Sequence, residues 1–429
     1  MKYDLIIVGG GAAGLYAGAQ LATYCDRESK EKKIDPKNIV IIDSSPELGK
    51  KLLLTGAGQC NLTQGGPIKD FVSHYGENGS KIRSLLYAHN NSDTMQFFES
   101  LGLRLFERED GKVFPQSLSA KEVRNVLLAR CKKNIEIQTN TKLIDIKILA
   151  ENTGFELSLE KENKQIVMQT RFLLLSCGGA SYPKTGSDGS IFPILKKMGL
   201  SVVKLKPALV PFFVDNYPFK ELSGIAIEAV YIKKVGEKMA KKTFEPLLFT
   251  HDSFSGPAAL HFSRYLDQGD KIFFDYLPAC KEEEFLTEVQ IKASGNSKQV
   301  ASFFSQLPAL KEVGLPKRFV EVICQRSSID PTTKISAVSG KKLKDLVHLF
   351  KSDVFRVTGT KGWQLAMVSR GGVSLEELDL KSLSSKKIPS LFFAGEILDI
   401  DGDSGGYNLQ FAFSSAKKAT ESIIASWEK

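Results

Sequence analysis

The sequence predicts an α/β protein whose parallel sheet is assembled from both ends of the chain. Near the N-terminus, the apolar run Leu5–Val8 is typical of a buried parallel strand, and a glycine-rich turn and an alanine-rich helix follow it. Near the C-terminus, the run Leu391–Ala394 leads through a glycine-rich loop into a helix from about Asn408. Between them, residues 200–350 change to short β-like runs and then short helices, which indicates an insertion of mixed character.

Length and composition fit a globular protein of two or three domains. The chain has 429 residues, of which 42% are hydrophobic and 25% charged. No apolar run is long enough to span a bilayer, and the first residues enter a strand pattern without the features of a signal peptide. We therefore expect a cytoplasmic protein without a membrane partner. The six scattered cysteines form no CxxC pair, so we expect no disulfide framework, metal site or dithiol centre.

The formal net charge of +9 leaves two interpretations open. Lysine pairs recur along the chain, among them Lys32–Lys33, Lys196–Lys197, Lys241–Lys242 and Lys341–Lys342. They are typical of a solvated, lysine-rich surface, or they form an electrostatic footprint for an anionic partner such as RNA. Charge alone does not choose between these interpretations.

The first glycine motif has the spacing of a dinucleotide-binding turn. Gly9 permits the turn from strand to helix, Gly11 lets the backbone approach a pyrophosphate, and Gly14 allows the helix to pack on the strand. Helix N–H groups then favour the phosphates. Asp43, which ends the next strand pattern, is placed to bind a ribose. It comes later than the usual spacing of about 20 residues, because a polar loop over residues 25–38 precedes it.

A second glycine cluster distinguishes the chain from a simple NAD-binding unit. Gly56 and Gly58 lie among small or polar residues, from Thr55 to Asn61, whose backbone and amide groups can follow a long ligand closely. An ordinary surface turn is the alternative for this stretch alone.

The C-terminal strand ends in Gly395–Glu396, which is typical of FAD-binding Rossmann proteins. The acid can accept hydrogen bonds from ribityl hydroxyls, and the start of the following helix can offer N–H groups to the flavin's pyrimidine edge. We therefore predict non-covalent FAD rather than FMN. No second strand–GxGxxG–helix unit follows, so NAD(P)H, as the expected reductant, would dock only transiently at the flavin.

Several motifs resemble the BaiN/RdsA-type family of FAD-dependent oxidoreductases, also called aminoacetone-oxidase-like flavoproteins. The resemblance spans essentially the whole chain and includes "VGGGAAG", "GKKLLLTGAGQCNLT", "CGGASYPKTGSDG", "LFTHDSFSGPAAL" and "RGGVSLEELD". This chain departs from the family pattern at Gln59, where arginine is usual, and at Ser253, where glycine is usual. The first departure affects a charged flavin or substrate contact, and the second affects the substrate loop.

The resemblance implies a discontinuous FAD-binding Rossmann-like domain of the glutathione-reductase type, with an inserted β-barrel-like and a small helical domain. The expected boundaries are 1–195 and 373–429 for the FAD-binding domain, 196–280 and 351–372 for the β-rich domain, and 281–350 for the helical subdomain. The residues expected at the cofactor are Gly9, Gly11, Ala12, Ala13, Gly14, Asp43, Lys51, Thr55, Gly56, Gly58, Gln59, Cys60, Asn61, Gly178, Gly179, Gly395, Glu396, Gly406, Tyr407, Asn408 and Leu409.

The implied chemistry is reduction of an activated C=C bond by hydride from the flavin. One family branch reduces uridine to dihydrouridine in ribosomal RNA, and another reduces conjugated enones of steroid acids. His251 and Cys60 are the candidate proton donors, while Tyr182 is a weaker candidate; each could instead be structural. A small-molecule enone reductase, an amine or alcohol oxidase, and a non-catalytic flavin sensor stay open as alternatives. The sequence indicates no oligomeric state.

Overall fold

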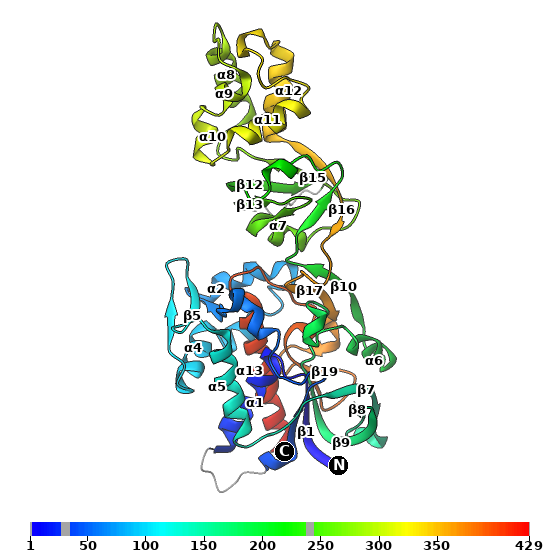
Figure 1. Cartoon of the computed structure of the whole chain (residues 1–429). Helices are drawn as coiled ribbons and strands as arrows, with labels where there is room; N and C mark the ends of the chain where they lie inside the picture. The colour runs from blue at the N-terminus through cyan, green and yellow to red at the C-terminus, as the bar shows by residue number, and fades with distance from the viewer. Residues whose placement is uncertain (1, 27–34, 237–243, 429) are drawn as a thin grey trace. The chain divides into compact units, whose positions relative to one another are not determined.

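The computed structural model describes residues 2–26, 35–236 and 244–428. They form two compact units, Met1–Pro207 with Met367–Lys429 and Ala208–Ala366, and each unit is described by itself (Figure 1). The predicted boundaries were 195/196 and 372/373. They differ because β17 (Val368–Val373) contacts the segment Gly395–Ile397 of the first unit, and β10 (Val202–Ala208) pairs with β17. The lysine pairs Lys32–Lys33 and Lys241–Lys242, and much of the polar loop before Asn38, lie outside the described residues.

The first unit contains a nine-stranded sheet in the order β18-β19-β20-β9-β1-β2-β6, with β7 and β8 continuing from β9. Its strands β20, β9, β1, β2 and β6 run parallel. The N-terminal strand β1 and the C-terminal strand β20 both pair with β9, so both ends of the chain enter one sheet. The bounds are β1 (Lys2–Val8), β2 (Ile39–Ile42), β6 (Glu136–Gln138), β7 (Thr141–Ile148), β8 (Phe155–Lys161), β9 (Lys164–Leu175), β18 (Leu378–Asp379), β19 (Ser384–Ser385) and β20 (Leu391–Phe393).

Helix α1 (Ala12–Asp26) packs against both α5 (Ala120–Lys132) and α13 (Tyr407–Trp427). Its small residues allow this burial, since a Cβ added at Gly18 would lie 2.7 Å from Ile41 of β2. Tyr16 packs on Phe413 of α13 with ring centroids 4.8 Å apart. The remaining elements are β3 (Thr63–Gln64), α2 (Ile68–Phe71), α3 (Arg83–Ala88), α4 (Asn91–Ser100), β4 (Leu105–Glu107), β5 (Lys112–Pro115) and α6 (Ile191–Lys197).

The second unit is a closed six-stranded barrel with a helical part. The barrel order is β11-β14-β13-β12-β15-β16, and pairing of β11 with β16 closes it. Buried aromatic side chains, including Phe254, Phe274 and Phe355, fill its core. The elements are β11 (Phe212–Val214), β12 (Ala226–Lys234), β13 (Glu245–Phe249), β14 (Phe254–Ser255), α7 (Gly256–Ser263), β15 (Lys271–Asp275), α8 (Glu282–Ala293), α9 (Val300–Phe304), α10 (Pro308–Glu312), α11 (Lys317–Arg326), α12 (Gly340–Lys351) and β16 (Asp353–Thr360).

This architecture confirms the predicted fold class, an α/β protein with a sheet built from both chain ends and an inserted barrel with helices. None of the described helices is long and apolar enough to cross a membrane. The six cysteines are free, and the described residues hold no cluster of three or more metal-ligating side chains.

Candidate functional site

The glycine turn after β1 contains two kinds of glycine. Gly9 has a left-handed φ of 97°, and a Cβ there would lie 2.6 Å from the carbonyl oxygen of Ser176. A Cβ at Gly14 would lie 1.9 Å from the carbonyl oxygen of Gly9. The packing of the chain therefore requires both glycines. Gly11 differs, because a Cβ there would meet none of the described atoms within 4 Å. The turn thus leaves open space beside Gly11, at the N-terminus of α1.

Asp43 lies directly beside this turn. One oxygen of its carboxylate accepts a hydrogen bond from the N–H of Gly10 at 2.7 Å, and the other accepts from the N–H of Ser45 at 2.7 Å. Asp43 is half-buried. Because an ionised carboxylate has about four acceptor positions, it retains capacity for hydroxyl donors from a ligand.

The second glycine cluster forms an exposed, irregular loop. The 3₁₀ segment Leu52–Gly58 is interrupted at Gly56 and Ala57, which are both left-handed. Around Gly58, a Cβ would find only the carbonyl oxygen of Leu53, at 4.0 Å. The side-chain oxygen of Asn61 is buried and has no hydrogen-bond partner among the described residues. A buried acceptor without a donor is unfavourable.

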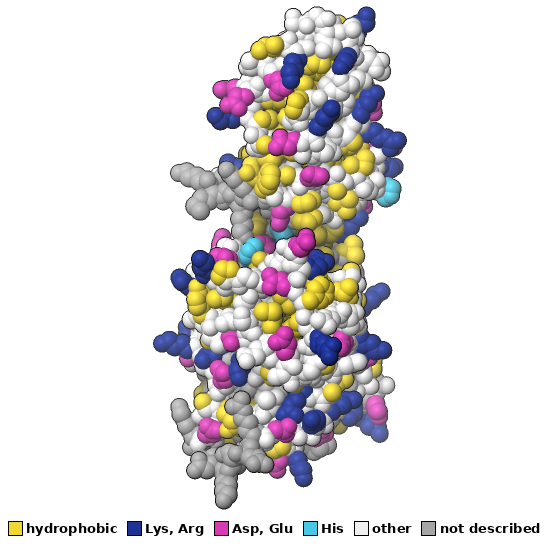
Figure 2. Space-filling view, turned by 90° about the vertical axis from the view of Figure 1, so that its left-hand side faces the viewer, with side chains coloured by type: hydrophobic (Ala, Val, Ile, Leu, Met, Phe, Trp, Pro, Cys, Tyr) yellow, Lys and Arg dark blue, Asp and Glu magenta, His cyan; other side chains and the backbone are white. Residues whose placement is uncertain are grey.

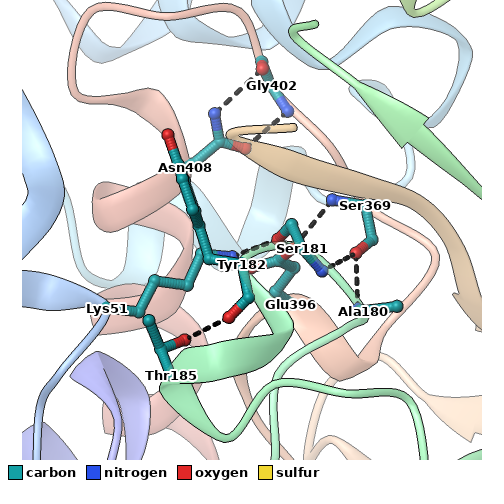
Figure 3. Close-up of polar contacts among 9 residues, drawn as sticks. All are labelled: Lys51, Ala180, Ser181, Tyr182, Thr185, Ser369, Glu396, Gly402 and Asn408. Carbon is teal, nitrogen blue, oxygen red and sulfur yellow. Dashed lines mark hydrogen bonds and ion pairs between the residues drawn. The ribbon is translucent and has the colours of Figure 1, made fainter. Parts of the chain in front are cut away.

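Glu396 connects four segments of the first unit through its carboxylate (Figure 3). Its Oε2 lies 2.5 Å from the Nζ of Lys51. Its Oε1 accepts from the hydroxyl of Ser181 and from the backbone N–H of Ser369, both at 2.7 Å. Lys51 also donates to the Ser181 hydroxyl. The side chains of Glu396 and Lys51 are 21% and 23% exposed, so this ion pair is only partly screened by water.

The glycines before this cluster are required by packing. A Cβ at Gly179 would lie 2.2 Å from the Ser369 hydroxyl, which accepts from the backbone N–H groups of Ala180 and Ser181. A Cβ at Gly178 would lie 2.8 Å from the Ser187 hydroxyl. Gly395 likewise faces Ala13 at 2.9 Å. Protein contacts alone explain these glycines, and a role in cofactor binding stays a prediction.

The loop that leads into α13 is compact, because hydrogen bonds join its own residues. Gly406 precedes the helix with a φ of 98°, and a Cβ there would lie 2.5 Å from the backbone of Thr63. The side-chain amide of Asn408 accepts from the N–H of Gly402 at 2.8 Å and donates to its carbonyl at 2.9 Å (Figure 3). The backbone N–H groups of Asn408 and Leu409 bond to none of the described residues, so they are available at the helix N-terminus.

Neighbouring side chains fix this helix start. His74 stacks on the ring of Tyr407 at a centroid distance of 4.0 Å, and its Nδ1 lies 2.9 Å from Asp403. Gln410 is fully buried, and its amide bonds to Thr63, Thr94, Ser414 and the carbonyl of His89. The Gln410 side chain therefore has a structural role.

The two candidate proton donors lie in different units. Cys60 has 0% exposure, and burial raises the pKa of its thiol to about 12. His251 is exposed, in the turn between β13 and β14. Ser253 is accommodated in that turn, where its hydroxyl bonds to Thr250 at 2.7 Å. Tyr182 has a left-handed φ of 51°, and its carbonyl accepts from the Thr185 hydroxyl.

Sequence reasoning missed Ser181, Ser369 and the pair of His74 with Asp403. Serine occurs in many surroundings, so its position carries no periodic signal. The only sequence signal was that Ser181 and Ser369 lie within or beside the quoted motifs.

Comparisons with known proteins identify the class and the family. The fold and the family define the class, a Rossmann-type FAD-dependent oxidoreductase. The chain belongs to the family described as "HI0933-like protein Rossmann domain", which matches residues 3–422. This assignment confirms the predicted resemblance.

Two relatives and one solved structure cover almost the whole chain. The ribosomal RNA dihydrouridine synthase of Escherichia coli K12 is 29% identical over 99% of this chain and 98% of its own length. The 3-dehydro-bile acid delta(4,6)-reductase of Clostridium scindens is 27% identical over 95% of this chain and 96% of its own. The crystal structure of a 3-ketosteroid dehydrogenase from Rhodococcus jostii RHA1 has a TM-score of 0.52 at 13% identity. The match covers 99% of this chain and 97% of the dehydrogenase chain, and it supports the fold alone.

Removing the Glu396 carboxylate should destabilise the first unit. Glu396→Ala leaves Lys51 and Ser181 without their shared acceptor, so we expect the free energy of unfolding to fall by about 1–3 kcal/mol. Glu396→Gln keeps an acceptor for Ser181 and Ser369 and should lose less. Urea unfolding of both variants measures this. Glu421→Ala is the control, since it breaks an exposed pair with Lys417; an equal loss in that variant would contradict the connecting role of Glu396.

Proposed function

We propose that this protein is an NAD(P)H-driven, FAD-dependent reductase of a C=C bond conjugated to a carbonyl, and that its acceptor is a uracil base of ribosomal RNA. The observation that carries the cofactor assignment is the open space beside Gly11. The chain itself does not require glycine there, whereas a pyrophosphate against the turn would.

The residues of the first unit fit FAD in other respects. Asp43 would accept hydrogen bonds from the adenosine ribose, and the N–H groups at the start of α1, including Ala12 and Ala13, would face the pyrophosphate. Thr55, Gly56, Gly58, Gln59, Cys60 and Asn61 would line the flavin half, where the buried Asn61 oxygen lacks a donor. Lys51 and Glu396 would hold the ribityl chain, and the backbone at Gly406, Tyr407, Asn408 and Leu409 would lie at the pyrimidine edge.

Bound FAD supplies the exchange of a hydride with NAD(P)H and with the acceptor. The role of the chain is to orient the flavin and to tune its reactivity. The N–H groups of Asn408 and Leu409 would favour negative charge at the edge that they face, because they combine hydrogen-bond donors with the positive end of the helix dipole. Glu396 would fix the ribityl region without taking part in proton transfer to the acceptor, since its carboxylate is already bonded to three groups.

The acceptor is proposed from chemistry and from relatives. Uracil and a conjugated enone both present an electron-poor β-carbon, to which hydride adds while a proton reaches the α-carbon. Two relatives, in Escherichia coli and Haemophilus influenzae, are named ribosomal RNA dihydrouridine synthases and match 99% and 97% of this chain. A uracil can reach a flavin only when it is unstacked or flipped out.

A small-molecule enone is the second candidate, because one relative is named a bile-acid reductase. Charge does not decide between the two acceptors. Lys and Arg exceed Asp and Glu by five in the first unit and by four in the second. Figure 2 shows basic side chains interspersed with acidic and apolar ones on the face that it displays.

Gly11→Val should abolish FAD binding while leaving the fold intact, because its side chain would enter space that the described chain leaves open. The purified variant should be colourless with a normal circular dichroism spectrum, whereas heat should release FAD from the wild type. Gly340→Val is the matched control, since its Cβ also meets no described atom and it lies in α12 of the other unit. Release of FMN from the wild type, or full FAD in Gly11→Val, would refute the assignment.

A strain lacking the gene should lose dihydrouridine at a position in its ribosomal RNA. Mass spectrometry of ribosomal RNA nucleosides measures this, and the wild-type gene, but not the Gly11→Val form, should restore the nucleoside. RNA binding should weaken steeply with salt, since phosphate contacts release counterions. Unchanged dihydrouridine, together with salt-insensitive NAD(P)H oxidation driven by an added enone, would favour the small-molecule acceptor.

His251 is the proton donor that we propose to test first, because its side chain is exposed whereas Cys60 is fully buried. His251→Asn should abolish product while NAD(P)H still reduces the flavin, which stopped-flow absorbance follows separately. Cys60→Ala should keep product formation. His348→Asn, another exposed histidine of the second unit, is the control. Loss of product in Cys60→Ala alone would assign the donor to the thiol instead.

A further inference from the structure

Ser187 has a buried hydroxyl without a partner. Its side chain lies within the loop that follows β9, the residue is 7% exposed, and its Oγ bonds to none of the described residues. A buried hydroxyl without a hydrogen bond destabilises the chain that contains it. Neither the predicted contacts nor the proposed reaction uses this residue, so its burial in this state has no explanation within the chain.

The Ser187 hydroxyl and Glu396 lie beside two different glycines of the loop that follows β9. The two adjacent glycines show this, because a Cβ at Gly178 would meet Ser187 at 2.8 Å, whereas a Cβ at Gly179 would meet Ser369 at 2.2 Å and Glu396 at 3.1 Å. Among the described residues, no hydrogen bond joins the Ser187 hydroxyl to the cluster expected to hold the ribityl chain.

The same loop packs on the residues that follow Asp43. A Cβ at Gly186 would lie 2.8 Å from the Ser45 hydroxyl, and that hydroxyl donates to the carbonyl of Thr185 at 3.3 Å. Burial, with the negative charges of Asp43 and Asp188, raises the pKa of Cys177 to about 12, which agrees with the closeness of these segments. The loop thus packs against the residues that follow β2, where the adenosine ribose is expected.

We propose that the Ser187 hydroxyl hydrogen-bonds to the adenosine half of FAD. The inference rests on the proposed FAD binding and adds a contact that the sequence motif did not identify. Adenosine offers ribose hydroxyls and ring nitrogens, and a serine hydroxyl can donate or accept. Binding would give the buried hydroxyl the partner that it lacks.

Titration of the flavin-free full-length chain with FAD and, separately, with ADP tests this proposal. ADP contains the adenosine half without the flavin. Ser187→Ala should lower the affinities for both ligands by the same factor, about three- to tenfold, as expected for one lost hydrogen bond. Ser187→Cys, which keeps the size of the side chain, should behave similarly. Ser190→Ala, at an exposed serine three residues on, should change neither affinity.

Asn61→Ala shows whether the effect is specific to the adenosine half, because the buried oxygen of Asn61 is assigned to the flavin half. This variant should lower the affinity for FAD and leave the affinity for ADP unchanged. Thermal unfolding without ligand separates binding from structure. Ser187→Ala removes an unpaired polar group, so its midpoint should equal or exceed that of the wild type.

The outcomes are distinct. Unchanged ADP affinity in Ser187→Ala, absent ADP binding in a wild type that binds FAD, or a lower midpoint without ligand would overturn the inference and leave the FAD assignment standing. A wild type that binds neither ligand would refute the proposed function itself.

Discussion

The interaction on which the site depends most is the shared use of the Glu396 carboxylate. The parallel sheet brings β20 beside β9, but strand pairing ends at Phe393 and Leu175. Beyond these residues the loops need other contacts, and Glu396 supplies them by bonding to Lys51, Ser181 and Ser369. The four residues come from distant parts of the sequence. A single charged acceptor therefore fixes loops that the backbone ladder does not reach, and charge-assisted hydrogen bonds are strong enough for this purpose.

The glycines show how one residue type serves two purposes around this site. At Gly9, Gly14 and Gly179 a side chain would collide with the chain itself, so glycine there permits close packing. At Gly11 it would collide with nothing described, so protein packing does not explain the glycine there. A motif read from sequence treats all of these glycines alike. The structure separates the glycines that packing requires from the one that lies beside open space.

Local patterns predicted the strands, the helix after the first turn, and the position of Asp43 at the end of the second strand. Apolar runs and glycine spacing are properties of neighbouring residues, so they can be recognised in the sequence. Local patterns also indicated the short β-like runs and helices of the insertion, whereas their arrangement as a barrel with a helical part was implied only by the family resemblance. The domain boundaries differ because β17 contacts the segment Gly395–Ile397 and pairs with β10, and these contacts join residues far apart in sequence. The serines at Glu396 and the hydroxyl of Ser187 were missed for the same reason, since their meaning depends on contacts that sequence spacing does not reveal. The role of Gln410 was likewise not apparent, because its side chain belongs to a buried network with Thr63 and Thr94 that sequence spacing does not reveal.

The glycine-rich loop before α13 is the least expected part of the site. Glycines in such a loop suggest a backbone that approaches a ligand, yet their nearest neighbours are in the protein. A Cβ at Gly402 would lie 3.1 Å from Tyr75, and one at Gly406 would lie 2.5 Å from Thr63. Asn408 closes the loop on Gly402, and His74 holds Tyr407 by stacking. These contacts fix the helix start before any ligand arrives. N–H groups held in this way need no reorganisation when charge develops near them, and this is the condition under which backbone donors stabilise charge most effectively.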